Sequence, residues 1–130
     1  MSCPDDNTRR GLVEGLERCS EGEYFAAHEA FETAWRLAPE AERDFFQGLV
    51  HAVVFAYQAG RGRAVGAERQ RCKALSRLSR YPPCHQGVDL ARLRAALDRR
   101  ETDLRHHMVE CVAQPPGPVE EEQQPERDQG

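Results

Sequence analysis

Apolar residues recur along this chain with the spacing of α-helices. In five segments the apolar positions fall three and four residues apart, on one face of a helix: 8–19, 20–37, 39–58, 63–80 and 88–113. No segment shows the alternation of apolar and polar residues that is typical of a half-buried strand. The pattern therefore predicts an all-α fold, a single compact bundle of about five helices over residues 8–113.

Polar, proline and glycine residues mark the expected ends of these helices. Ser20 and Glu23 have the spacing of a capping box, which predicts that the second helix starts there. Pro39 suits the first turn of the third helix, because that turn leaves a backbone N–H unused and proline has none. Gly60 follows the third helix, and Pro82-Pro83 stops the fourth.

The third and the last helix have distinct patterns. The third is apolar on nearly its whole circumference, which indicates a central helix covered by its neighbours. Gln47 and His51 interrupt it on one narrow strip. Gly48 lowers helix propensity, so we expect a neighbouring element to approach its backbone closely. The last helix carries apolar residues at a seven-residue interval, namely Leu90, Leu97, Leu104 and Cys111.

The two ends of the chain offer little apolar surface to a core. We expect a flexible N-terminus at residues 1–7 and a disordered acidic tail at residues 114–130. The net charge of the 130 residues is -4, which argues against nucleic acid as a partner. The charge is uneven, because residues 61–80 hold seven Arg or Lys against one Glu, whereas residues 120–128 hold five acids against one Arg.

The expected compartment follows from features that the chain lacks. No apolar run approaches the ~20 residues that span a bilayer, and the N-terminus lacks the regions of a signal peptide. The five cysteines are odd in number, widely spaced and without a CxxC pair: Cys3, Cys19, Cys72, Cys84 and Cys111. This pattern favours reduced thiols over disulfides or a zinc site. We therefore expect a soluble, cytoplasmic protein with no membrane partner.

The second helix carries the pattern with the most chemical content, His28-Glu29-x-x-Glu32. At about 100° per residue, His28 falls within the apolar stripe that ends at Trp35, and Glu32 follows His28 by one turn. Trp35 is interpreted as a core residue or as the apolar wall of a pocket.

Buried polar groups need partners, and polar side chains interrupt the apolar faces of both the second and the third helix. The short connection between these helices favours antiparallel packing, so we expect His28 and Glu32 to face Gln47 or His51. Arg61 is expected nearby, where it would neutralise the carboxylates. The predicted polar cluster or ligand pocket comprises His28, Glu29, Glu32, Trp35, Gln47, His51 and Arg61.

Two interpretations of this cluster stay open. In the first, its side chains are structural hydrogen-bonding partners. In the second, they bind a divalent metal, because the pattern shares its first His with the zinc-protease helix and has Glu32 where the second ligand stands. His28, Glu32 and His51 are then the candidate ligands. Glu29 or Glu32 is the candidate catalytic base of a hydrolytic reaction.

Three groups of residues occur in a fixed order between about Leu12 and Leu78. They are Gly22-x-Tyr24-Phe25-x-Ala27-His28-Glu29-x-x-Glu32-x-x-Trp35, then Phe46-Gln47-Gly48-Leu49-Val50, and then Arg61-Gly62 with Gly66-Ala67. This order resembles the bacterial domain of unknown function family 309. The resemblance implies a small all-helical protein with no established activity. The chain departs from the family pattern at Arg63, where Asn is usual, and at His51, where Gln is common, which makes His51 a poor choice as a family-wide ligand.

Two classes of function fit these patterns. The first is a non-enzymatic helical protein that acts through partners or as a homo-oligomer, with the polar cluster holding the core in place. The alternative is a metal- or small-ligand-binding protein that uses the HExxE helix for hydrolysis. We favour the first class, because buried charges usually pair with one another. The presence of stoichiometric metal in the purified protein would separate the two.

Overall fold

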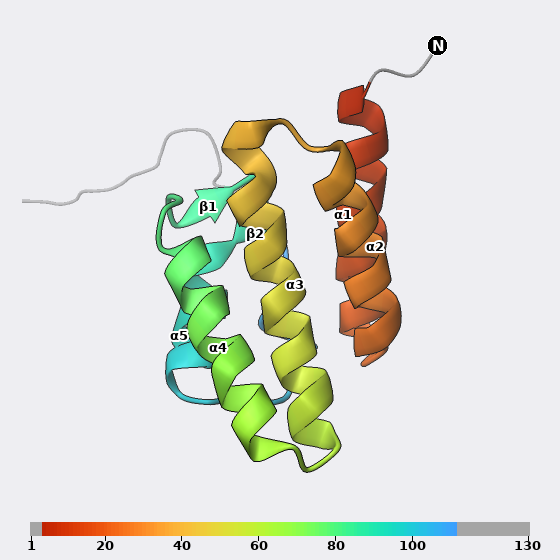
Figure 1. Cartoon of the computed structure of the whole chain (residues 1–130). Coiled ribbons are helices and arrows are strands. Elements are labelled where there is room, and N and C mark those ends of the chain that lie inside the picture. The colour runs from red at the N-terminus through yellow and green to blue at the C-terminus, as the bar shows by residue number, and fades with distance from the viewer. Residues whose placement is uncertain (1–3, 112–130) are drawn as a thin grey trace, which may run out of the picture.

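The computed structural model describes residues 4–111, whose long helices pack side by side (Figure 1). In chain order its elements are α1 (Pro4–Ser20), α2 (Tyr24–Leu37), α3 (Glu40–Gly60), α4 (Ala64–Leu78), β1 (Cys84–His85), β2 (Val88–Asp89) and α5 (Leu90–Asp98). The prediction of a single all-α bundle is confirmed. Residues 4–7 belong to α1 rather than to a flexible N-terminus, and the predicted tail at 114–130 lies outside the described residues.

The helix α3 is the centre of the bundle, as its apolar circumference predicted. It packs against α2 on one side and α4 on the other, while α1 packs against α2 (Figure 1). The close approach expected at Gly48 is present, because a Cβ atom there would lie 2.5 Å from Leu78 Cδ2. Gly15 plays the same part between α1 and α2, where a Cβ atom would overlap the ring of Phe31. Because glycine has no side chain, Gly15 lets α1 pack tightly on α2, and Gly48 lets α3 pack tightly on α4.

The turn between α1 and α2 corrects the predicted capping box. Ser20 is the last residue of α1, and its Oγ donates a hydrogen bond to the carbonyl of Glu17 at 2.7 Å. Gly22 has φ +79, and the N–H of Glu23 donates to the carbonyl of Arg18 at 2.9 Å. This is a glycine C-cap of α1, which satisfies carbonyls that the helix end leaves free. Glu23 makes no side-chain hydrogen bond to the start of α2.

A short hairpin, made of two strands of two residues each, follows α4 in a region where the sequence predicted no strand. β1 and β2 pair antiparallel, with His85 opposite Val88. Gln86 and Gly87 form the turn with φ 48 and 82, and positive φ at both positions gives a twist that suits a hairpin. His85 Nε2 lies 2.6 Å from Glu42 Oε1, which ties the hairpin to α3.

The last helix is much shorter than the predicted 88–113. α5 ends at Asp98, and the chain reverses at Arg100, which has φ 58. Leu104 is buried, as the seven-residue interval indicated, and Met108 is buried too, but both belong to irregular chain that packs back on the bundle. The apolar interval thus identified the core residues Leu90, Leu97 and Leu104 correctly, but it placed Leu104 in a helix that ends before it.

The cysteine prediction is also wrong, because Cys84 and Cys111 form a disulfide. A backbone hydrogen bond holds Cys111 beside the hairpin, because the N–H of Cys111 donates to the carbonyl of Gly87 at 2.7 Å. Among the described cysteines, Cys19 is free and buried and Cys72 is free and exposed. None of the helices in residues 4–111 has the length and hydropathy that crossing a membrane requires.

Candidate functional site

The two key side chains of the HExxE pattern pair within α2. His28 Nε2 lies 3.7 Å from Glu32 Oε2, and Glu32 Oε1 lies 3.6 Å from Arg36 Nη2. The His28 side chain is 24% exposed, and its Nδ1 is buried without a hydrogen-bond partner in the described part of the chain. The pair therefore borders the surface and leaves one ring nitrogen of His28 unused.

His51 faces the other side of α3. Its Nδ1 lies 2.7 Å from Gln70 Oε1 on α4, so the ring N–H donates to the amide oxygen. Burial lowers the pKa of His51, and the positive charges of Arg77 and Lys73 lower it further, against the effect of the Gln70 hydrogen bond. The neutral ring thus serves as a link between α3 and α4.

The remaining cluster candidates are dispersed. Arg61 is exposed, and its guanidinium lies over the Tyr57 ring at 5.4 Å. Trp35 is half-buried against the core, with the Arg43 guanidinium 5.0 Å from its ring. Gln47 is half-buried on α3. Within residues 4–111, no hydrogen bond or ion pair joins His28 or Glu32 to Gln47, His51 or Arg61, so the expected single cluster is not formed by polar contacts.

Glu29, the other candidate base, is exposed on α2 and borders a different feature. It lines a groove of about 390 Å³ between α1 and α2, with Arg10, Glu14 and Thr33 among the other lining residues.

The candidate metal ligands His28, Glu32 and His51 do not converge on one point. No group of three His, Cys, Asp or Glu side chains in the described residues is arranged to hold a metal ion.

A different arrangement crosses the surface between α2 and α3. Glu32 contacts His28, the ring of His28 lies 5.6 Å from that of Phe25, and Phe25 lies 5.8 Å from the ring of Tyr57. Arg61 completes the series over Tyr57. We call these five residues the α2–α3 row. Phe25 is 54% exposed, so the row presents an aromatic side chain to solvent.

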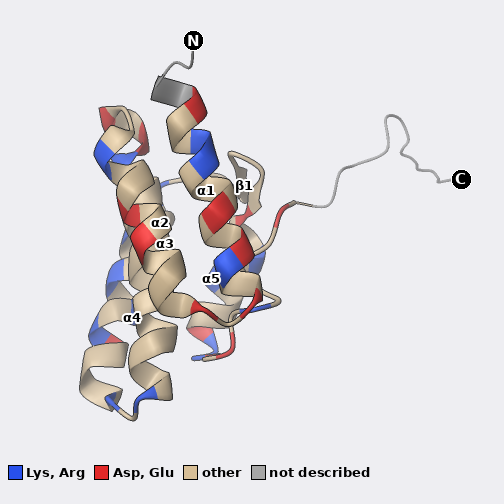
Figure 2. Ribbon diagram, turned by 90° about the vertical axis from the view of Figure 1, so that its right-hand side faces the viewer, with Lys and Arg blue, Asp and Glu red and all other residues tan. Residues whose placement is uncertain are grey.

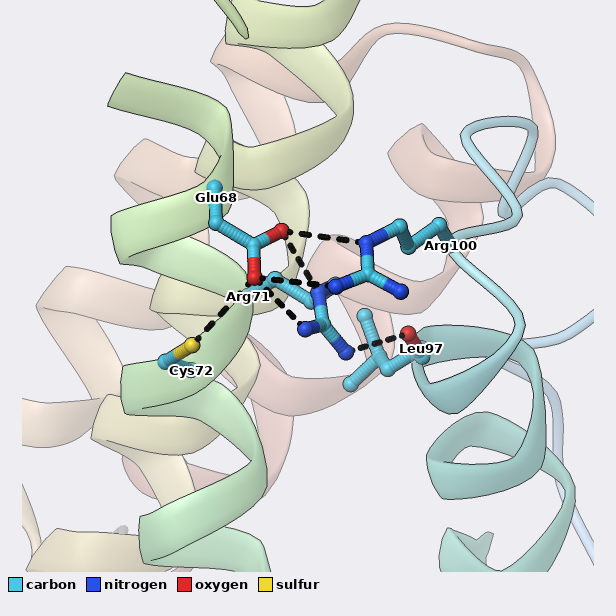
Figure 3. A network of polar contacts seen from close by, with 5 residues as sticks. All are labelled: Glu68, Arg71, Cys72, Leu97 and Arg100. Atoms are coloured by element: carbon cyan, nitrogen blue, oxygen red, sulfur yellow. Dashed lines mark hydrogen bonds and ion pairs between the residues drawn. The ribbon is translucent and has the colours of Figure 1, made fainter. Parts of the chain in front are cut away.

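Sequence reasoning missed a polar network that joins α4 to α5 (Figure 3). The guanidinium of Arg71, which is only 8% exposed, donates two hydrogen bonds to the Glu68 carboxylate, at 2.9 and 2.7 Å. It also donates a hydrogen bond to the carbonyl of Leu97. Arg100 adds a second guanidinium to Glu68 at 3.3 Å. Glu68 is the one acid in the basic stretch 61–80, and its three-residue distance from Arg71 was the available signal.

The sequence analysis also missed a second set of contacts, which gives Tyr24 of the first sequence motif a structural role. The Tyr24 hydroxyl donates to Asp103 Oδ1 at 3.4 Å and accepts the N–H of Leu104 at 3.0 Å. The Cys19 thiol donates to the carbonyl of Leu104. Burial raises the pKa of Cys19 to about 12, which keeps this thiol protonated. These residues attach the irregular chain after α5 to α1 and α2. The sequence analysis did not predict this contact, because it placed residues 103 and 104 within a long last helix.

Comparison with known proteins agrees with the sequence motifs. No curated protein matches the chain. The model of one family, described as a domain of unknown function (DUF309), matches residues 12–70. These residues run from α1 into α4 and include the whole α2–α3 row. Over this span, a little under half of its length, the chain resembles DUF309.

Proposed function

We propose that this is a non-enzymatic helical protein that acts by self-association, with the α2–α3 row as its contact surface. The observation that carries the proposal is the aromatic series of the row, in which the exposed Phe25 contacts the half-buried rings of His28 on α2 and Tyr57 on α3. Aromatic and arginine side chains contribute much of the energy at protein interfaces, because they offer large contact areas with little loss of conformational freedom.

The positions of the catalytic candidates support a non-enzymatic role. Glu29 borders the α1–α2 groove, whereas Glu32 is paired with His28 and Arg36. His51 is paired with Gln70, on another face of α3. The His51–Gln70 pair then aligns α3 with α4, whereas the His28–Glu32 pair lies within α2.

The charges of the row favour a second copy of the chain as partner. Glu32 lies at one end, Arg61 at the other, and the aromatic rings lie between them. A two-fold axis through the middle would place Glu32 of each copy opposite Arg61 of the other, with the Phe25 side chains in contact. A surface that carries complementary charges at its two ends is self-complementary under such an axis.

Sedimentation velocity from about 1 µM to about 1 mM protein tests the proposal. We expect a monomer–dimer equilibrium that Phe25→Ser weakens by at least about tenfold in Kd. Leu37→Ser is the matched control, because Leu37 is also exposed on α2 but lies outside the row. This control should leave the dimer unchanged.

A charge exchange identifies the contact itself. Glu32→Arg and Arg61→Glu should each weaken the dimer, and the double variant should restore it. Glu32 and Arg61 make no ion pair within one described chain, so restoration can only arise between copies. A protein that stays monomeric up to about 1 mM, or a double variant no better than either single one, would exclude this contact.

A further inference from the structure

The charges of the described chain are separated into an acidic and a basic part. Residues 4–60 carry eleven acids against five Arg, whereas residues 61–111 carry twelve Arg or Lys against six acids. Figure 2 shows red segments along α1 and α2 and blue segments along α4. The net charge of the whole chain argued against nucleic acid as a partner, but the charge of a single surface decides which partner that surface attracts.

The helix α4 concentrates positive charge on one of its faces. Arg69, Lys73, Arg77 and Arg80, the last just after the end of the helix, fall within about 80° around its axis and extend over about 16 Å along it. We call these four residues the basic face. Arg69, Lys73 and Arg80 are exposed, and Arg77 is half-buried.

The neighbouring acids leave the basic face positively charged. Arg77 Nη1 lies 2.6 Å from Asp44 Oδ1, and Arg80 binds the other oxygen of the same carboxylate. Arg69 and Lys73 form no ion pair with any described residue. The one acid of α4 is bound elsewhere, in the network of Figure 3. Four positive side chains against one carboxylate leave a net charge of +3.

The other side chains of this surface indicate the class of partner. Cys72 and Ser76 line a shallow hollow of about 280 Å³ together with residues of the basic face. Among the described residues of α4, Val65 is the one large apolar side chain that is exposed. A protein interface has an apolar or aromatic centre, and a helix that binds a membrane inserts apolar side chains. Contacts to phosphate groups require only positive charge and hydrogen-bond donors.

We propose that the basic face binds the phosphate backbone of duplex nucleic acid, without preference for sequence. Its four basic side chains and the Ser76 hydroxyl donate to phosphate oxygens, and the release of counterions from the duplex drives the binding. A duplex fits better than a single strand, because α4 has no aromatic side chain on which unstacked bases could lie. Asp44 holds the guanidinium groups of Arg77 and Arg80 in place, which reduces the conformational freedom lost on binding.

The salt dependence of binding tests the proposal. Fluorescence anisotropy is measured with labelled duplexes of about 20 base pairs, one of DNA and one of RNA, at salt concentrations from about 20 to about 200 mM. With three net charges on the basic face, log Kobs should fall against log salt with a slope of about -3. Duplexes of different sequence should bind equally, and a single strand of the same length should bind more weakly.

A double variant assigns the binding to the basic face. Arg69→Gln with Lys73→Gln should lower the affinity at least about tenfold at about 50 mM salt and reduce the slope to about -1. Because neither side chain has an ion pair among the described residues, urea unfolding of this variant should match that of the parent. The matched control is Arg10→Gln with Arg43→Gln, which removes two exposed charges from α1 and α3 and should keep the slope of the parent.

Lys73 allows the contact to be observed directly, because it is the only lysine of the chain. A succinimidyl ester acylates its amine, and peptide mass spectrometry measures the rate. An excess of duplex should slow this reaction at least about threefold at low salt, and the protection should be lost at about 1 M salt. Equal acylation rates with and without bound duplex would place the contact elsewhere on the molecule.

Three further results would overturn the proposal. One is no binding of either duplex up to about 1 mM protein at about 20 mM salt. The second is an equal loss of affinity in the double variant and in its control, which would reflect net charge alone. The third is binding to anionic lipid vesicles but not to duplexes, which would make the basic face a membrane-binding surface. None of the four residues belongs to the α2–α3 row, so this proposal and the proposed function can fail separately.

Discussion

Glu68 shows how a single side chain can connect distant parts of this chain. It accepts hydrogen bonds from Arg71 on its own helix and from Arg100, which lies beyond the end of α5. The hydrogen bonds from Arg71 are the main cause that lowers the pKa of Glu68 from 4.5 to about 2, and Arg100 adds to the effect. The carboxylate therefore neutralises a guanidinium that the fold has buried, and it does so at the junction of α4 and α5.

Replacement of Glu68 by Gln should make stability less dependent on pH in the acid range. Because the pKa is lower in the folded chain than in the unfolded one, the contribution of Glu68 is complete above pH 4.5 and is lost as the pH falls toward 2. We expect Glu68→Gln to be less stable than the parent at pH 7 and the difference to narrow at about pH 3.

Urea unfolding at the two pH values measures this effect. Glu14→Gln is the control, since Glu14 is exposed and forms no ion pair among the described residues. A difference between parent and Glu68→Gln that is the same at both pH values would show that the Glu68 carboxylate is not stabilised by its guanidinium neighbours.

At the scale of elements, the α3–α4 pair depends on the missing side chain of Gly48. Leu78 occupies the space that a Cβ atom would need, and Leu78 is itself fully buried. The same helix pair is linked by the His51–Gln70 hydrogen bond and by Asp44 with Arg77. Close packing and polar links therefore fix the register of these two helices together.

Gly48→Ala should destabilise the protein by about 1–3 kcal/mol, because the added methyl group forces Leu78 or the helix to move. Gly60→Ala provides the comparison, since Gly60 lies in the same helix and a Cβ atom there meets nothing within 4 Å. That variant should be neutral or slightly more stable. Urea unfolding of both variants measures the difference, and equal stabilities would contradict the tight α3–α4 contact.

At the scale of the whole molecule, the disulfide closes the fold. It links β1 to Cys111 across a sequence separation of 27 residues. The segment between α5 and Cys111 reaches back to Tyr24 and Cys19, so it covers α1 and α2 as well. The bridge thus stabilises the one long stretch of irregular chain in the described core.

A Cys84→Ser, Cys111→Ser double variant should lose about 2–4 kcal/mol of unfolding free energy, because a closed loop restricts the unfolded chain. Cys72→Ser, which removes an exposed free thiol, should have little effect. Alkylation in denaturant without reductant should modify Cys19 and Cys72 of the parent and leave Cys84 and Cys111 unmodified. Modification of Cys84 and Cys111 would contradict the disulfide.

Local pattern determined the helical content of this protein, the central place of α3 and the close approach at Gly48. Each follows from neighbours in the sequence: helical periodicity places apolar residues on one face, and a helix apolar all round must be covered on all sides. The resemblance to DUF309 also follows from the order of the sequence motifs, all of which lie within the matched residues 12–70.

Tertiary structure decided which faces meet. The angle of His51 around its helix does not say which neighbour lies there, and α3 has a neighbour on each side, so His51 faces Gln70 on α4 rather than His28 on α2. The hairpin, the end of α5 and the disulfide depend likewise on the path of the chain after α4. Cys84 and Cys111 meet because the backbone turns at Gln86-Gly87 and again at Arg100, and such long-range contacts leave no periodic signal in the sequence.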